Sequence, residues 1–231
     1  MSCKVQQSVC SDCVTYVKSR IKFNTFNTFN NVKKIMFNDK YGLTEAVLAN
    51  RKTQTRRIIP SADHKNRRYE GAPKLTNPDG TKSVLAQFSD KRVLSAYAIN
   101  EVVAIAQAYK NIPKFPQLSK QGVEELKQSP GWNNKMFVRA DLMPHHIRIT
   151  DIRVERLQDI SDKDCLAEGI EVFPDRKICE YGFRFVKGEA LHWIGADSLR
   201  QVYASLIDKV SGKGTWESNP YVFVYDFRLI D

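Results

Sequence analysis

The stretch HIRITDIRVERLQDI, residues 146–160, alternates apolar and polar side chains along most of its length. Successive side chains of a β-strand point to opposite faces, so this pattern predicts a strand with one buried and one solvated face. The phase of the pattern slips once, near Asp151, which predicts a β-bulge or a tight turn at that point. The apolar positions are Ile147, Ile149, Ile152, Val154 and Leu157.

The last segment, NPYVFVYDFRLI (residues 219–230), shows a similar pattern built largely from aromatic residues. Aromatic side chains are enriched in strands, so the segment predicts a terminal strand that closes a sheet or a barrel. Apolar runs at 32–37 and 100–109 predict two further strands. The residues expected on one face of the terminal strand are Tyr221, Phe223, Tyr225, Phe227 and Leu229.

Three helices are predicted between these strands. The first, near residues 43–47, ends at Asn50, which tolerates the left-handed conformation. The second, SDKDCLAEGI, begins with Ser161 as N-cap and ends at Gly169. The third, within 197–210, is amphipathic. Strands and helices interleave without a regular βαβ rhythm, which favours a mixed α+β barrel over a doubly wound sheet.

Polar and turn-rich stretches divide the chain further. Residues 1–31 contain the low-complexity run FNTFNTFNN and are predicted to be a flexible arm. Residues 32–231 are predicted to be a single domain, with insertions near 61–96, 110–135 and 171–193.

The positive charge is concentrated in one part of the chain. The formal net charge is +10, and residues 51–92 hold eleven Lys or Arg against four Asp or Glu. Concentrated positive charge is costly unless an anion offsets it, and nucleic acid is the commonest such anion. An ordinary basic, solubilising surface is the alternative.

Neither a membrane segment nor a metal site is predicted. No apolar run approaches the roughly 20 residues needed to cross a bilayer, and the N-terminus does not resemble a signal peptide, so we expect a cytoplasmic protein. The five cysteines are an odd number, which favours reduced thiols. Cys10 and Cys13 have a metal-ligand spacing but lack a second ligand pair, so we expect no metal and no cofactor.

The stretch LANRKTQTRRIIP, residues 48–60, carries the candidate site. Lys52 and Thr55 are three residues apart, a spacing that puts side chains on opposite faces of a strand but on the same side of a helical turn. If the two residues cooperate, the chain must still be turning at 52–55. The alternative is an ordinary helix C-terminus whose cations suit the helix dipole.

Neighbouring charges bear on what Lys52 can do. Arg51, Arg56 and Arg57 are expected to lower its pKa. A partly neutral lysine can accept the proton of a threonine hydroxyl, whereas a cationic one would hold a carbonyl or a phosphate.

LANRKTQTRR (residues 48–57) resembles the Gly-x-Lys-x-x-Thr-x-Arg signature of ASCH domains, which belong to the PUA-like superfamily of small β-barrels. Asn50 stands at the position of the signature glycine. RITDIRVERLQDISDKDCLAEGI (148–170) and GKGTWESNPYVFVYDF (212–227) both resemble ASCH proteins of the phage- and prophage-associated type. The resemblance implies a PUA-like mixed β-barrel with a few flanking helices.

The resemblance also implies roles for individual residues. Some ASCH relatives are amidohydrolases that cleave N4-acetylcytidine with a lysine, a threonine and a glutamate. By motif these are Lys52, Thr55 and Glu168: Lys52 as base, Thr55 as nucleophile, and Glu168 to orient the lysine or to handle the leaving amine. Candidate ligand-binding residues are Arg51, Arg56, Arg57, Gln107 and Arg148. Gln107 stands where phage-type relatives often carry a glutamate, and Arg148 matches an arginine that relatives carry after Met-Pro.

Two functions follow from these observations. The first is a binding module for RNA or a modified nucleoside, because PUA-like barrels mostly bind such ligands. The second is an amidohydrolase acting on N4-acylated cytidine. An enzyme needs the three residues around a small closed cavity, whereas a binder needs an open basic groove with exposed aromatic residues.

Overall fold

A five-stranded sheet is the centre of the fold. The computed structural model describes residues 32–60, 68–173, 179–187 and 190–231, so the arm predicted at 1–31 lies outside the described residues, and residues 32–231 form one compact unit. The strand order is β1-β7-β8-β12-β2; β1 and β7 are parallel, and the other pairings are antiparallel. The strands are β1 (Lys33–Ile35), β2 (Gln54–Ile58), β7 (Val102–Ile105), β8 (His146–Arg156) and β12 (Tyr221–Leu229).

The predicted slip in β8 is confirmed as a bulge. On β12, Asp226 pairs with Asp151 and the next residue, Phe227, pairs with Ile149, so Thr150 is the extra residue. The bulge restores the alternation, and both Ile149 and Ile152 are buried.

The position of β12 differs from the expectation for a closing strand. It lies between β8 and β2 rather than at an edge. Val222 and Val224 are buried as fully as Phe223 and Tyr225 on the opposite face. The aromatic alternation did not indicate this, because valines at the intervening positions suit either a solvated or a buried face.

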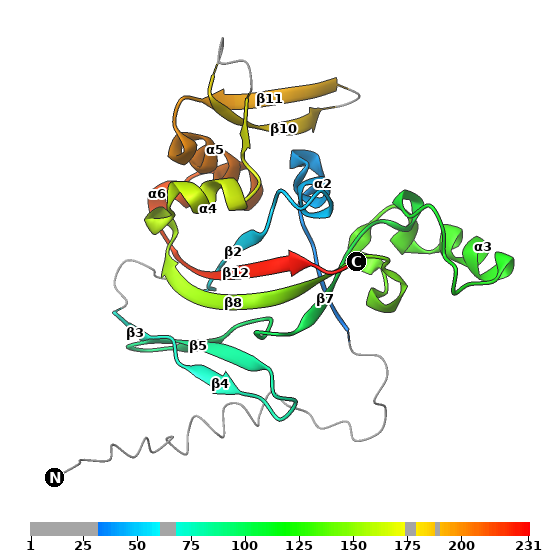
Figure 1. Cartoon of the computed structure of the whole chain (residues 1–231), viewed down its shortest axis with the longest axis horizontal. Helices are drawn as coiled ribbons and strands as arrows, with labels where there is room; N and C mark the ends of the chain where they lie inside the picture. The colour runs from blue at the N-terminus through cyan, green and yellow to red at the C-terminus, as the bar shows by residue number, and fades with distance from the viewer. Residues whose placement is uncertain (1–31, 61–67, 174–178, 188–189) are drawn as a thin grey trace. The chain divides into compact units, whose positions relative to one another are not determined.

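Both faces of the central sheet are covered. A smaller sheet lies on one side of β8 and β12, and α2, α4 and α5 lie on the other (Figure 1). The smaller sheet has the order β3-β5-β4, with β6 also paired to β5. Its strands are β3 (Tyr69–Gly71), β4 (Lys74–Thr76), β5 (Lys82–Phe88) and β6 (Arg92–Leu94).

The smaller sheet was not foreseen, because residues 61–83 appeared turn-rich. The turn is present, with Asn77 N donating to Thr81 O at 2.8 Å and Gly80 at φ 82°. The strands around it nevertheless pack inward, and Val84 and Phe88 belong to the main hydrophobic core. Short strands between turn residues carry too few apolar positions to show a periodicity.

The helices and a third sheet complete the domain. The helices are α2 (Leu43–Leu48), α3 (Lys120–Gln128), α4 (Asp162–Ala167), α5 (Leu199–Ser211) and α6 (Thr215–Ser218). The third sheet comprises β9 (Glu171–Val172), β10 (Tyr181–Lys187) and β11 (Ala190–Ala196). Short 3₁₀ turns occur at η1 (Asp39–Tyr41), η2 (Tyr109–Asn111), η3 (Pro130–Trp132), η4 (Lys135–Phe137), η5 (Ala140–Leu142) and η6 (Leu157–Asp159).

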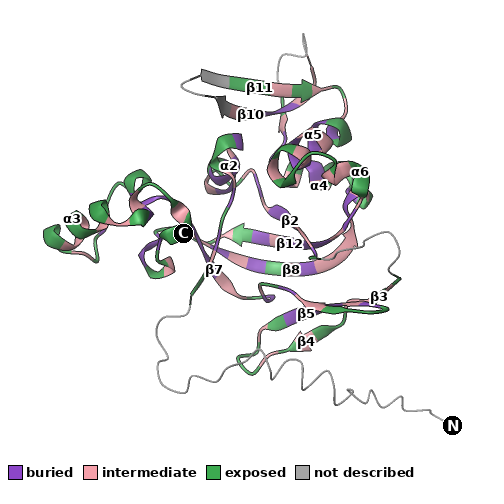
Figure 2. Cartoon of the chain, turned by 180° about the vertical axis from the view of Figure 1, so that it is seen from behind, coloured by how far each residue is buried: buried purple, intermediate pink, exposed green. Residues whose placement is uncertain are grey.

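The helices predicted at 43–47, 161–169 and 197–210 are therefore all present. The second insertion contains a further helix, α3, none of whose residues is buried (Figure 2). All helices in the described part of the chain are too short or too polar to span a bilayer.

The α+β class is confirmed, but closure into a barrel is not seen. Over the described ranges, strand pairing ends at β1 on one side and β2 on the other. The two edge strands are joined instead by a side chain, since Arg57 Nη2 donates to the backbone O of Met36, just after β1, at 2.6 Å. A seam thus separates β1 from β2, and the candidate site lies along it.

Candidate functional site

A tight turn after α2 places Lys52. Asn50 adopts φ 56°, the left-handed conformation predicted for the end of this helix. The backbone N–H groups of Arg51 and Lys52 both donate to Ala46 O, at 2.8 and 2.9 Å. The turn directs Lys52 into the protein, where only 2% of the residue is exposed.

A second short element places Glu168. Ser161 caps α4 by accepting from Asp164 N at 3.2 Å, and the helix ends at Glu168, followed by Gly169 at φ 100°. The ends of the two elements are joined because Thr53 N donates to Ala167 O at 2.9 Å. This backbone bond brings Lys52 and Glu168 together across more than a hundred residues.

Lys52 and Glu168 form a buried ion pair. Lys52 Nζ donates to Glu168 Oε2 at 2.5 Å and to the backbone O of Glu168 at 2.8 Å. A Cβ atom on Gly169 would lie 3.4 Å from Lys52 Cβ, an ordinary van der Waals contact, so the glycine is favoured by its φ of 100° rather than by lack of space. Burial favours the neutral amine and lowers the pKa of Lys52, although Glu168 acts in the opposite direction.

Of the three arginines expected to lower the pKa of Lys52, two do so. Arg57 and Arg56 both lower the pKa of Lys52. Arg51 turns away, pairing with Glu171 at 2.9 Å, and lines a separate cavity of about 120 Å³.

Thr55 lies on β2 opposite Tyr225 and is 5% exposed. It lines the same cavity as Lys52 and Glu168. The two residues were expected to share a turn at 52–55. The chain instead extends from Gln54, so Lys52 lies before the strand and Thr55 lies on it. No hydrogen bond to the Thr55 hydroxyl is formed by the described residues, so this group is available to a ligand.

The shared cavity has a volume of about 690 Å³ and follows the seam between β1 and β2. Its walls combine an apolar surface from α5 and from the segment just after β1 with several charged side chains. The lining residues are Met36, Phe37, Asn38, Asp39, Lys40, Leu43, Lys52, Thr55, Arg56, Arg57, Ile58, Lys135, Glu168, Tyr203, Leu206, Ile207, Val210 and Ser211.

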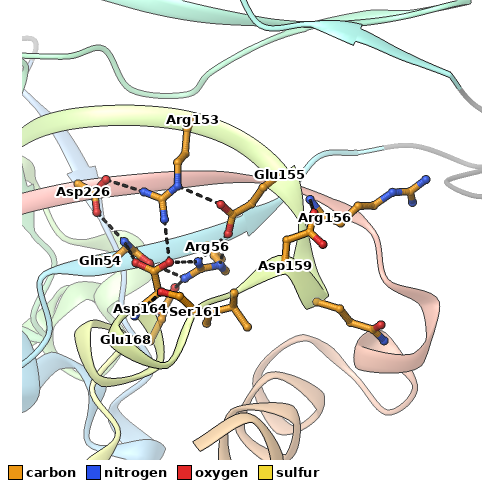
Figure 3. Close-up of polar contacts among 12 residues, drawn as sticks. Gln54, Arg56, Arg153, Glu155, Arg156, Asp159, Ser161, Asp164, Glu168 and Asp226 are labelled. Atoms are coloured by element: carbon orange, nitrogen blue, oxygen red, sulfur yellow. Dashed lines mark hydrogen bonds and ion pairs between the residues drawn. The ribbon is translucent and has the colours of Figure 1, made fainter.

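Arg56 holds Glu168 from the other side. Its Nη1 donates to Glu168 Oε1 at 3.1 Å (Figure 3). The other oxygen, Oε2, is left to Lys52. The rest of the guanidinium contacts Glu155 at 2.6 Å and Asp164 at 3.3 Å. Burial opposes its charge, but these carboxylates outweigh that effect and raise the pKa of Arg56.

The network of ion pairs extends beyond Arg56 to a second arginine, Arg153. Arg153 bridges Glu155, Asp164 and Asp226 at 2.8–3.1 Å (Figure 3). Gln54 Nε2 donates to Asp164 and to Asp226 at 2.9 and 2.6 Å. Side chains held by several charge-assisted bonds lose little further freedom on ligand binding, so the network fixes the carboxylate of Glu168.

The remaining predicted ligand residues are dispersed. Arg57 lines the cavity. Gln107 and Arg148 do not; the Gln107 side-chain oxygen is buried without a partner in the described residues, and Arg148 Nη1 donates to Asn100 O at 3.1 Å. Neither residue is brought near Lys52.

Most of the cavity lining was not selected from the sequence, and Lys40, Lys135 and Tyr203 are the members that bear on its chemistry. Lys40 belongs to no motif, and Lys135 lies outside the stretches that carry the resemblance. Tyr203 belongs to the apolar stripe of the helix predicted at 197–210 and appeared to be an ordinary core residue. It is 1% exposed, and its hydroxyl has no partner among the described residues. From the sequence, a tyrosine in the apolar stripe of a helix that lines a cavity cannot be distinguished from one that packs in the core.

Comparison with known proteins adds no constraint: no family model, curated protein or solved structure matches this chain. Within the described ranges, no group of three or more His, Cys, Asp or Glu is arranged to hold a metal ion. Cys10 and Cys13 lie outside those ranges. The function must therefore be argued from the geometry of the cavity.

Proposed function

We propose that this chain is an ASCH-type protein of the PUA-like superfamily and that its cavity hydrolyses the N4-acyl amide of an acylated cytidine. The observation that carries the proposal is the burial of Lys52 and Glu168 as an ion pair in the wall of a cavity that Thr55 also lines. Buried charges are costly, and groups with strongly perturbed pKa values in a cavity are typical of functional sites.

The residues divide the reaction as follows. Neutral Lys52 accepts the proton of the Thr55 hydroxyl as the oxygen attacks the acyl carbon, and Glu168 stabilises the resulting ammonium. The C–N bond then breaks, and the leaving amine takes the proton from Lys52. Water hydrolyses the acyl-threonine ester, with Lys52 again accepting and returning a proton. The products are cytidine and the free carboxylic acid.

The size and walls of the cavity suit this substrate class. A volume of about 690 Å³ lies within the range of roughly 300–1,000 Å³ that is typical of small-molecule sites. Leu206 and Ile207 offer an apolar surface to a nucleobase, and the charged residues lie beside it. The cavity lies between β1 and β2, which do not pair with each other as strands.

A second candidate is binding of RNA or a modified nucleoside without hydrolysis. The observation that favours it is the hydrogen bonding of Lys52, which reaches Glu168 twice but makes no bond to Thr55 among the described residues. A lysine held charged by its carboxylate would donate to a ligand carbonyl instead of accepting a proton.

One paired experiment separates the two functions. The parent protein and the variants Lys52→Met, Thr55→Ala and Thr55→Ser are incubated with N4-acetylcytidine, and cytidine release is followed by chromatography. In the catalytic case Lys52→Met and Thr55→Ala abolish turnover, and Thr55→Ser retains part of it because the hydroxyl survives. Thr53→Ala is the matched control, since Thr53 does not line the cavity.

Affinity for the same compound is measured in parallel. In the binding case Lys52→Met weakens binding by about tenfold to a hundredfold, the worth of one charge-assisted hydrogen bond. If the parent binds acylated nucleosides, loses affinity on Lys52→Met and hydrolyses none of them, the catalytic proposal is wrong and the binding function stands.

A further inference from the structure

The charges that line the cavity do not cancel. Five cationic side chains face two carboxylates, those of Asp39 and Glu168. The cations are Lys40, Lys52, Arg56, Arg57 and Lys135. A cavity with a positive excess raises the local concentration of anionic ligands and favours their binding.

The two carboxylates are already engaged by three of the cations. Glu168 accepts from Lys52 and Arg56, and Asp39 accepts from Lys135 Nζ at 2.8 Å. Lys40 and Arg57 are left over. Over the ranges that the structure describes, neither forms an ion pair with a carboxylate.

Arg57 is placed next to the reactive group. It is two residues beyond Thr55 on β2, so the two side chains project from the same face about 7 Å apart along the strand. One Nη donates to Met36 O, and a guanidinium has five N–H donors, so others remain for a ligand.

Three of the cavity cations differ in exposure, which places the most exposed of them nearest the solvent. Lys52 is buried, Arg57 is half-buried and Lys40 is exposed. Lys40 lies on η1, across the seam from β2, with its Nζ 5.6 Å from the centre of the Tyr41 ring. The reacting amide would therefore occupy the inner end, and any anionic group of the ligand the outer end.

We infer that the ligand of this cavity is a mononucleotide rather than a free nucleoside, with its phosphate bound by Arg57 and Lys40. This inference rests on the proposed function for the identity of the base and sugar. It adds a substrate class and two residues that discriminate by charge. Arginine suits the role because its planar fork of donors matches the oxygens of a phosphate.

The test compares cytidine with cytidine 5′-monophosphate by calorimetry at low salt, using the full chain. Neither compound carries an acyl group, so binding is measured without turnover. We expect the monophosphate to bind about tenfold to a hundredfold more tightly, as one or two charge-assisted hydrogen bonds provide. Added salt should reduce this preference, because it screens exposed charges.

Single variants assign the preference to residues. Arg57→Gln and Lys40→Gln should each weaken binding of the monophosphate much more than binding of cytidine, since neutral ligands gain little from these charges. Arg228→Gln removes the same charge from an exposed position outside the cavity and should change neither affinity.

Equal affinity for the two compounds, or binding of neither, would overturn the inference. So would an equal loss of monophosphate affinity on Arg228→Gln, which would indicate a general charge effect. Tighter binding of a cytidine-containing RNA oligonucleotide than of the monophosphate would reject a mononucleotide as the ligand. If acylated cytidine is hydrolysed without a preference for the phosphate, the proposed function stands and the inference is wrong. If the phosphate is preferred but nothing is hydrolysed, the inference stands and the catalytic function is wrong.

Discussion

Lys52 is the residue whose surroundings matter most to the chemistry. A fully buried ammonium is unfavourable unless it is paired, and Glu168 supplies the partner at 2.5 Å. Arg56 supports the pair by holding the other oxygen of the same carboxylate. The lysine is thus held between opposing influences, with burial and two arginines favouring the neutral form and Glu168 favouring the charged one.

This balance predicts the pH dependence of hydrolysis. The neutral amine is the base, so kcat/KM should rise with pH through an ionisation below the ordinary lysine value of 10.5. Arg57→Gln removes a charge that lowers the pKa of Lys52 and should move this ionisation upward. Glu168→Gln removes the charge that raises it and should move the ionisation downward. pH–rate profiles of the three proteins test these directions, and shifts of the same sign in both variants would contradict them.

Tyr203 gives a second prediction at this scale. A buried hydroxyl without a partner costs about 1–3 kcal/mol, so Tyr203→Phe should leave the free energy of unfolding unchanged or raise it by about 1 kcal/mol. Tyr225→Phe is the matched comparison, because the Tyr225 hydroxyl accepts from Ala96 N at 3.0 Å and its loss should destabilise the protein. Urea denaturation measures both. A larger loss for Tyr203→Phe than for Tyr225→Phe would show that its hydroxyl has a structural partner.

At the scale of elements, the site is built from the ends of two short helices. The turn after α2 presents Lys52 and the end of α4 presents Glu168, with one backbone bond from Thr53 to Ala167 between them. Short helices derive most of their stability from caps and packing rather than from their own propensity. The geometry of the ion pair therefore depends on the capping of α4.

Ser161→Ala tests this dependence. Loss of the cap should lower the free energy of unfolding by about 1 kcal/mol. It should also reduce turnover, because a frayed α4 would misplace Glu168, although Ser161 does not line the cavity. Ser161→Asp retains a capping oxygen and should restore both properties. Thermal unfolding and the hydrolysis assay provide the two readouts, and equal stability of the alanine variant and the parent would refute the argument.

At the scale of the whole domain, one sheet is covered on both faces and the cavity lies along its seam. β12 is paired on both sides, and Val222 and Val224 are fully buried. α3 has no buried residue. Stability is therefore expected to be distributed unevenly between the sheet and α3.

Hydrogen exchange should report this distribution. Amides of β12 should exchange only through global unfolding, whereas those of α3 should exchange through local opening with far smaller protection. Peptide-resolved exchange measured by mass spectrometry distinguishes the two segments. Protection of α3 equal to that of β12 would contradict the expectation that α3, which has no buried residue, opens locally.

The sequence alone determined those features that depend on near neighbours. The end of α2 at Asn50, the cap at Ser161 and the bulge in β8 were all predicted, because each is set by a few adjacent residues and their backbone preferences. Lys52 and Thr55 were singled out by their spacing and cationic surroundings, but Glu168 was selected only through a resemblance to a family. Their approach to a single cavity could not be obtained from periodicity.

Only the tertiary structure decided what each side chain meets. Arg51, Arg56 and Arg57 are near neighbours in sequence, yet they turn toward Glu171, into the network around Glu168 and along the cavity, respectively. Alternation along a strand determines which side chains share a face, but it does not determine what packs on that face. The partner of Lys52 lies 116 residues away in the sequence. The spatial arrangement of the strands and the backbone bond from Thr53 to Ala167 bring it within 2.5 Å.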